Sequence, residues 1–225
     1  MLRIAYVNGR YTPHNAAAVH IEDRGYQFAD AVYEVCEVAR GYIVDMTGHL
    51  DRLDRSLREL EIAWPVHRSA LQVIMREVVA RNRVVNGLVY IQVSRGVAPR
   101  DHFFPAEGTP SSLVVVSKRT SPEAAAARAE KGLKVITVPE NRWDRVDIKS
   151  TGLLPNVLAR QKAKRAGAYE AWFVDQDGIV KEGAATNAWI VTKEGVLVTR
   201  PADHGILRGV TRTTIFKLAK HLGLT

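Results

Sequence analysis

The sequence predicts an α/β chain whose helices and strands fall into two lobes. The first half shows two amphipathic helical segments followed by two strand-like segments, and a further set of strands and helices follows a change of composition near residue 119. The order of these segments lacks the strand–helix–strand rhythm of a parallel sheet. No G-x-G-x-x-G motif is present in the sequence. We therefore expect mixed sheets in both halves and exclude a doubly wound dinucleotide-binding fold.

The first half opens with a hairpin signal. Asn8 and Gly9 lie between two short apolar runs, and this pair is typical of a tight hairpin turn. A glycine-containing turn is expected over 22–28. Thr47 is expected to cap a helix whose apolar face carries the leucines at positions 50, 53, 57 and 60.

A second helix is expected over 69–84, followed by strands at 88–96 and 112–117. The first of these strands alternates with period two, and the second is a short apolar run of the fully buried type. Residues 119–127 contain Ser, Thr and Pro and lack bulky apolar side chains. We interpret them as a connector between a small N-terminal α/β domain over 1–118 and a larger domain over 128–225.

The second lobe contains four further strand signals and two helix signals. Pro155 suits the first turn of a helix, and Gly223 suits the residue that ends one. We expect strands at 133–139, 168–175, 187–192 and 196–200, and helices at 155–166 and 210–222.

Composition excludes several classes of protein. The chain has 225 residues, of which 46% are apolar and 25% charged, so it is long and apolar enough to bury a core. We expect no membrane span, because no apolar run approaches about 20 residues, and no signal peptide. Cys36 is the single cysteine, which favours a reducing cytoplasm.

The net charge of +8 is compatible with anionic partners. Its basic residues are mixed with acidic ones, and the densest basic stretch, 159–165, has no interleaved aromatic residues for base stacking. We expect no nucleic-acid partner and no metal site.

Two segments carry residue types that suit a planar cofactor. Lys149 follows the apolar Ile148 in a loop, and a lysine that forms a Schiff base needs a partly desolvated site; a solvated surface lysine is the alternative. Glu182 precedes the small residues 183–185, which would let a ring approach the backbone closely. Its carboxylate could pair with a protonated pyridine nitrogen, or it could be a strand-end glutamate in water.

The loop at 95–105 could bind a carboxylate. Arg100 and His102 are two residues apart, so in an extended loop their side chains project to the same side and could act as a two-pronged donor. The alternative is an exposed loop in which the two residues have no joint role.

Two helix starts could bind an anion. Arg52 lies near the start of the first long helix, where a cation is unfavourable unless it serves an anion; an ion pair with Asp51 or Asp54 is the alternative. The amides of Val210 and Thr211 would lie at the start of the last helix and could bind a phosphate, or this could be an ordinary helix start with Thr211 as its cap.

Taken together, six segments resemble D-amino acid aminotransferases, in the same order and at similar spacing. They are EDRGYQFADAVYEV, HLDRL, RGVAPRDHFFP, RWDRVDIKS, VKEGAATN and ILRGVTR. The resemblance implies the fold type IV architecture of pyridoxal-5′-phosphate (PLP) enzymes, with a small N-terminal α/β lobe and a larger C-terminal lobe built on a mixed sheet or barrel. Family members continue past the helix ending near Gly223, so it also implies that the C-terminal part of the large domain is missing.

The resemblance implies roles for the cofactor-binding residues. Lys149 holds PLP and, once the substrate displaces it, moves a proton between the substrate's Cα and the cofactor. Glu182 pairs with the pyridine nitrogen, and Leu207 presses on the ring. Arg52 binds the phosphate together with the amides of Val210 and Thr211. Ala184 and Ala185 stand where relatives often carry serines.

The resemblance also implies the substrate site and the reaction. Tyr33, Arg100 and His102 bind the substrate carboxylate, and the Arg and His act from the other subunit of a homodimer. A D-amino acid such as D-alanine gives its amino group to a 2-oxo acid such as 2-oxoglutarate by a ping-pong mechanism. The alternatives are a branched-chain L-amino acid aminotransferase or an aminodeoxychorismate lyase of the same fold, against which the Arg100/His102 pair argues, and more distantly a non-catalytic PLP-binding protein.

Overall fold

The structure is a computed structural model that describes residues 3–224. Its contacts divide the chain into two compact units: Met1–Glu123 with Ile148–Gly152, and Ala124–Asp147 with Leu153–Thr225. The proposed division into domains 1–118 and 128–225 stays a prediction. Within residues 3–224, none of the helices combines the length and the apolar character that crossing a membrane requires.

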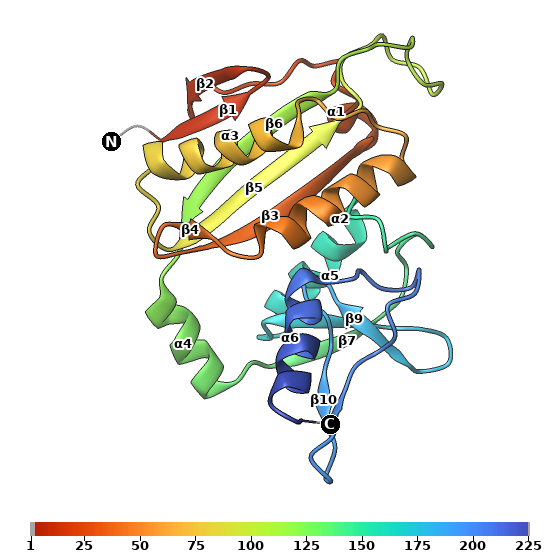
Figure 1. The fold of residues 1–225 in the computed structure, drawn as a ribbon. Helices are drawn as coiled ribbons and strands as arrows, with labels where there is room; N and C mark the ends of the chain where they lie inside the picture. Colours follow the sequence, from red (N-terminus) through yellow and green to blue (C-terminus); the bar gives the residue numbers. More distant parts are fainter. Residues whose placement is uncertain (1–2, 225) are drawn as a thin grey trace. The chain divides into compact units, whose positions relative to one another are not determined.

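The first unit is built on a six-stranded sheet (Figure 1). Every pair of neighbouring strands in it is antiparallel, so the mixed sheet expected in this half is wrong. In sheet order, the strands are β2 (Arg10–Pro13), β1 (Ile4–Val7), β6 (Ser112–Arg119), β5 (Gly87–Ser94), β3 (Ala31–Ala39) and β4 (Tyr42–Ile43).

The predicted hairpin is confirmed, and the turn after it is a short helix. Asn8 and Gly9 have φ values of 44° and 93°, which a tight hairpin turn requires and which glycine adopts at no steric cost. The segment expected to be a turn forms α1 (Arg24–Phe28). Asp23 caps this helix by accepting a hydrogen bond from the Gly25 amide.

Two long helices, α2 (Met46–Glu59) and α3 (Arg68–Arg81), cover one face of this sheet (Figure 1). The predicted apolar face of α2 is confirmed, because its leucines at 50, 53 and 57 are fully buried. Thr47 as the cap is wrong. The residue before the helix is Asp45, whose backbone is left-handed and whose side chain makes no capping hydrogen bond. The tight turn after β4 starts the helix earlier than expected and leaves Thr47 in its first turn.

Strand β3 was not expected from the sequence, and it positions the segment that contains Lys149. Val32, Glu34 and Cys36 lie on one buried face of β3. The Tyr33 amide donates to the Lys149 carbonyl at 2.9 Å, and the Thr151 amide donates to the Ala31 carbonyl at 3.0 Å. Residues 148–152 therefore run along the start of β3.

The second unit combines a small mixed sheet with two helices. β8 (Glu170–Val174) pairs in parallel with β7 (Val135–Pro139) and antiparallel with β9 (Val180–Gly183), which confirms the mixed sheet expected here. Its core contains Val138, Ala163 and Phe173. The strands within residues 124–147 and 153–224 do not close into a barrel. The remaining elements are β10 (Ile190–Val191), β11 (Leu197–Val198), α5 (Leu154–Arg165) and α6 (Val210–His221).

The expected connector is largely helical. α4 (Pro122–Lys131) follows β6 and has no buried residue. Its four consecutive alanines have the highest helix propensity.

Candidate active site

The predicted site residues lie in both units. Tyr33, Arg52, Arg100, His102 and Lys149 belong to the first unit, and Glu182, Leu207, Val210 and Thr211 belong to the second.

Lys149 is held between the sheet and helix α2 of the first unit. Its backbone amide donates to the Ser56 hydroxyl at 3.3 Å, and its Nζ atom lies 4.3 Å from the centre of the Tyr33 ring. That ring in turn stacks on Tyr90 with a centroid distance of 5.6 Å. The lysine is therefore not a freely solvated surface residue, and an ammonium over an aromatic face is attracted by the ring.

The buried carboxylate of Glu34, on β3, orients Arg52. Arg52 donates to it through two nitrogens, at 2.7 and 2.8 Å, and the His49 Nδ1 atom lies 2.7 Å away. Burial alone would raise the pKa of Glu34, but the hydrogen bonds from Arg52 and His49 and the charges of Arg52 and Lys149 outweigh it and lower that pKa. The forked bond fixes the plane of the guanidinium.

The alternative partners proposed for Arg52 have other partners of their own. Asp51 pairs with Arg68 at 2.5 Å and Asp54 pairs with Arg58 at 3.2 Å. The fork to Glu34 uses two of the N–H donors of the guanidinium, and the role of Arg52 in binding a phosphate stays a prediction.

Arg100 and His102 form a separate group, on the connection between β5 and β6. Both are exposed, and both contact the ring of Phe28. Tyr33 lies with Lys149 and Tyr90 instead. The joint role of these three residues in binding a carboxylate stays a prediction.

Glu182 in the second unit is buried, so the alternative of a solvated strand-end glutamate is wrong. Arg142 donates to it at 2.6 Å, the Asn187 amide group donates at 2.9 Å, and the Leu207 backbone amide lies 3.2 Å from both carboxylate oxygens. Leu207 is thus adjacent to Glu182 through its main chain.

A second carboxylate, Glu140, shares Arg142 with Glu182. Arg142 donates to Glu140 at 2.6 Å. Burial alone would lower the pKa of Arg142, but its hydrogen bonds with Glu140 and Glu182 outweigh this and raise that pKa. The same contact holds the pKa of Glu140 below its ordinary value, against the effect of burial. One guanidinium therefore lies between two carboxylates.

Close packing requires glycine at two positions near Glu182. A Cβ atom on Gly183 would lie 2.2 Å from the Thr186 hydroxyl, and one on Gly209 would lie 2.2 Å from the Asn187 side-chain oxygen. The buried Glu170 accepts hydrogen bonds from the Ala185 amide and the Thr186 hydroxyl, both at 3.3 Å. This folding of 183–187 brings Asn187 to Glu182.

The start of α6 is suited to an anion. Gly209 precedes the helix with an extended backbone, no side chain caps this end, and its first turn has no acidic residue; Thr211 as the cap is therefore wrong. Burial and the charge of Arg208 lower the pKa of Arg212. Within residues 3–224, no hydrogen-bond partner is present for the buried Nε atom of Arg212. Positive charge at this end of a helix favours a bound anion.

These features fit PLP. The cofactor carries a phosphate, a pyridine nitrogen and an aldehyde that condenses with an amine. The first unit offers a lysine and an oriented arginine, and the second offers a buried carboxylate and an uncapped helix start.

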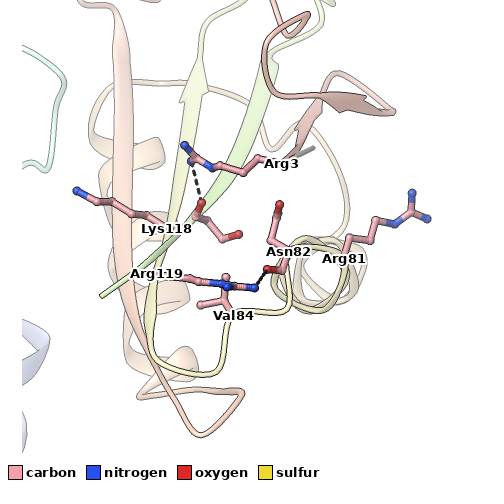
Figure 2. Close-up of a pocket in the computed structure, with 7 residues that line it drawn as sticks. Arg3, Arg81, Asn82, Val84, Lys118 and Arg119 are labelled. Carbon is pink, nitrogen blue, oxygen red and sulfur yellow. Dashed lines mark hydrogen bonds between the residues drawn. The ribbon is translucent and has the colours of Figure 1, made fainter. Parts of the chain in front are cut away.

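A cavity of about 370 Å³ in the first unit contains no predicted site residue (Figure 2). Arg3 donates to the Ser117 carbonyl at 3.0 Å, and Arg119 donates to the Asn82 carbonyl at 3.1 Å. These bonds attach the end of β6 to neighbouring chain segments, and cations near a helix C-terminus are favourable. These hydrogen bonds give Arg3 and Arg119 a structural role. The lining residues are Arg3, Arg81, Asn82, Val84, Ser117, Lys118 and Arg119.

Sequence reasoning missed four residues of the site: Glu34, His49, Arg142 and Asn187. Glu34 could have been found, because it interrupts an alternating apolar pattern with Val32, Cys36 and Val38. A charged residue at an inward-facing strand position is retained only when it is paired. No comparable pattern marks Arg142.

Comparison with known proteins agrees with this geometry. The D-alanine aminotransferase of Bacillus licheniformis is 39% identical over 217 residues, which cover 96% of this chain and 75% of that protein. The crystal structure of the branched-chain amino acid aminotransferase of Escherichia coli matches the fold with a TM-score of 0.89 at 23% identity, covering 100% of this chain and 76% of that one. A hypothetical aminotransferase from Mycobacterium tuberculosis in its PLP-bound form matches with a TM-score of 0.83 at 24% identity, covering 98% and 79%.

The family comparison covers most of the chain. The sequence pattern of the family described as amino-transferase class IV matches residues 31–225. This range includes every predicted site residue, and Phe28 lies just before it. Together with the Bacillus licheniformis relative, this match shows that the chain belongs to the class IV aminotransferase family.

Proposed function

We propose that this chain is a PLP-dependent transaminase that moves the amino group of a D-amino acid, such as D-alanine, to a 2-oxo acid, such as 2-oxoglutarate. The observation that carries the proposal is the position of Lys149, whose Nζ lies 4.3 Å from the Tyr33 ring on a segment joined to β3. The 39% identity to a D-alanine aminotransferase supports the choice of D-substrates. The branched-chain enzyme at 23% identity supports the fold alone.

The residues of the chain have distinct tasks in this proposal. Lys149 holds the cofactor and then removes and returns the proton at the substrate's Cα, which requires an amine that exchanges protons near the working pH. Glu182 accepts a hydrogen bond from the pyridine nitrogen and, as an anion, favours its protonated form. When bound, PLP supplies an electron sink for the negative charge that develops at Cα.

The phosphate and the substrate carboxylate are bound by separate groups. Arg52 and the amides of Val210 and Thr211 bind the phosphate, which the uncapped start of α6 supports. Leu207 contacts the ring. The active unit is a homodimer, and Arg100 and His102 bind the α-carboxylate of a substrate that is held mainly by the partner subunit. Tyr33 of the partner subunit completes the carboxylate site. The exposure of Arg100 and His102 on a connecting loop supports a role towards another chain.

We also propose a cytoplasmic location and no nucleic-acid partner. The buried free thiol of Cys36 supports the former. The basic stretch over 159–165 contains no aromatic residue that could stack on bases.

The choice of substrate is tested with the purified holoenzyme. D-alanine, L-alanine and L-leucine are supplied separately with 2-oxoglutarate, and the 2-oxo acid products are quantified. Aminodeoxychorismate is supplied alone in a parallel assay for cleavage. We expect turnover of D-alanine alone. Turnover of L-leucine without D-alanine would identify a branched-chain enzyme instead, and release of a cleavage product from aminodeoxychorismate would identify the lyase.

The role of Lys149 is tested by Lys149→Ala. We expect kcat with D-alanine to fall at least about thousandfold, since removal of a general acid–base costs about 10²–10⁴-fold and the anchor of the cofactor is lost as well. Lys193→Ala, at the exposed turn between β10 and β11, is the matched control and should retain full activity. Full turnover by Lys149→Ala would exclude this lysine as the catalytic residue.

A further inference from the structure

The side chains of Arg100 and His102 meet on one aromatic ring. The connection between β5 and β6 leaves the sheet beside α1 (Figure 1), and Phe28 is the last residue of that helix. The Arg100 guanidinium carbon lies 5.0 Å from the centre of the Phe28 ring. The His102 ring lies 5.5 Å from it, tilted by 54°. Two exposed side chains on a loop thus share a partner on a helix.

Phe28 is itself held by a buried arginine. The Arg24 guanidinium lies 4.8 Å from the Phe28 ring and is almost fully buried. Its Nε atom donates to the Asp30 carboxylate at 2.8 Å. Asp30 also binds Arg95 through two bonds of 2.8 and 3.0 Å, and these contacts lower the pKa of Asp30 against the effect of burial. The ring therefore lies on a rigid, ion-paired base.

Arg24 also binds the main chain of the loop between Arg100 and His102. Arg24 donates through its Nη1 atom to the main-chain carbonyl of Asp101 at 2.7 Å, and Asp101 stands between Arg100 and His102 in the chain. Arg95, at the start of the loop, donates to the carbonyls of Leu60 and Glu61 at 2.5 and 2.8 Å. The backbone of the loop is thereby fixed at its start and at the residue that separates the two side chains.

From this arrangement we infer that Phe28 is a positioning residue for the substrate carboxylate, acting through Arg100 and His102. The inference rests on the proposed function. An arginine side chain loses conformational entropy when it binds a carboxylate, because several of its rotatable bonds become fixed. A ring that holds the guanidinium beforehand reduces that cost. The negative face of the ring also attracts the Arg100 guanidinium.

A purely structural reading makes a different prediction. If Phe28 only covers apolar surface, any apolar side chain of similar size would replace it. Phe28→Leu keeps an apolar side chain and removes the ring, whereas Phe28→Tyr keeps the ring. Phe103→Leu is the matched control, since Phe103 lies on the same loop, is 81% exposed and has no ring partner within residues 3–224.

The experiment measures kcat and KM of the holoenzyme for D-alanine and for 2-oxoglutarate. We expect Phe28→Leu to raise both KM values about tenfold and to leave kcat within about twofold, because both substrates carry the same carboxylate. Phe28→Tyr and Phe103→Leu should remain near the wild type. In an Arg100→Ala background, Phe28→Leu should have much less effect, which is the coupling that a double-mutant cycle detects.

Several outcomes would overturn the inference. They are an unchanged KM in Phe28→Leu, a loss in kcat that follows a loss of thermal stability, or a full effect of Phe28→Leu in the Arg100→Ala background. A wild-type holoenzyme that transaminates no amino acid would instead remove the proposed function, and the inference with it. An active wild type with an unaffected Phe28→Leu variant removes only the inference.

Discussion

Predicted site residues belong to one charged group in each unit, and the two groups have opposite charge arrangements. In the first unit a single buried carboxylate, Glu34, lies between Arg52 and the His49 imidazole, and the charge of Lys149 acts on it as well. In the second unit a single buried guanidinium, Arg142, lies between Glu140 and Glu182. Glu34, Arg52 and Lys149 together carry one positive charge in excess, whereas Arg142, Glu140 and Glu182 together carry one negative charge in excess.

This difference matches what each half would bind. A phosphate is an anion and requires positive surroundings, whereas a protonated pyridine nitrogen requires a negative partner. In both halves the central ion is neutralised and hydrogen-bonded, so each group can be buried at an acceptable cost. The outer member of each group, Arg52 or Glu182, is thereby held in a fixed orientation and charge state for the ligand.

The largest expected effect comes from removing the central ion of the second group. Arg142→Met leaves Glu140 and Glu182 buried without their cation, and breaking a buried ion pair costs about 3–5 kcal/mol. Urea denaturation at pH 7 should show a loss of this size. Arg165→Met, at the exposed end of α5, serves as the control and should be nearly neutral. A loss below about 1 kcal/mol in Arg142→Met would mean that the three charges do not act as one group.

The central ion of the first group should show a smaller loss and a distinct dependence on pH. Glu34→Gln keeps the shape and one acceptor but removes the charge between Arg52 and His49, so we expect a loss of about 2 kcal/mol at pH 7. The folded-state pKa of Glu34 lies below its ordinary value of 4.5. Its contribution to stability is therefore present above about pH 4.5 and is lost as the pH falls through the lower, folded-state pKa.

Unfolding by urea at a series of pH values from 7 to 3 tests this sign. The stability difference between wild type and Glu34→Gln should be constant above about pH 4.5 and should shrink below it. Glu37→Gln, at an exposed position on the same strand, is the control and should follow the wild type. A difference that grows on acidification would contradict the lowered pKa.

Features that depend on neighbouring residues could be predicted from the sequence. Local signals were sufficient for the hairpin at Asn8–Gly9, the apolar face of α2 and the start of α6 at Val210. Each depends on neighbouring residues in the chain, such as a turn pair or a helical repeat. Resemblance to a family supplied the roles of Lys149 and Glu182, which have weak local signals.

What could not be predicted depends on pairings between distant residues. Strand β3 was missed because its buried Glu34 breaks the apolar pattern, and that glutamate is tolerated through Arg52 and His49, which are 18 and 15 residues away. The link between Arg142 and Glu182 spans 40 residues. The antiparallel order of the first sheet and the early start of α2 at Met46 follow from tertiary packing as well. The short stretches of sequence that reveal a turn or a helix do not contain both members of such a pair.

The smallest expected effect comes from Glu140, the carboxylate that shares Arg142 with Glu182. Its side chain is 18% exposed, and Glu140→Gln leaves the Arg142–Glu182 pair in place, so we expect a loss of about 1 kcal/mol in urea unfolding at pH 7. Because the pKa of Glu140 is also lowered, this loss should disappear as the pH falls below about 4.5. Glu130→Gln, on the exposed α4, should leave stability unchanged.

The ranking of Glu140→Gln against Arg142→Met decides whether the comparison between the two halves holds. If Arg142 mainly serves Glu182, removing Glu140 takes away one counter-charge and leaves the remaining pair neutral, so it must cost clearly less than removing Arg142. Equal losses would mean that Glu140 is the principal partner of Arg142. Glu182 would then depend on Asn187 and the Leu207 amide for its position, and the second half would no longer mirror the first.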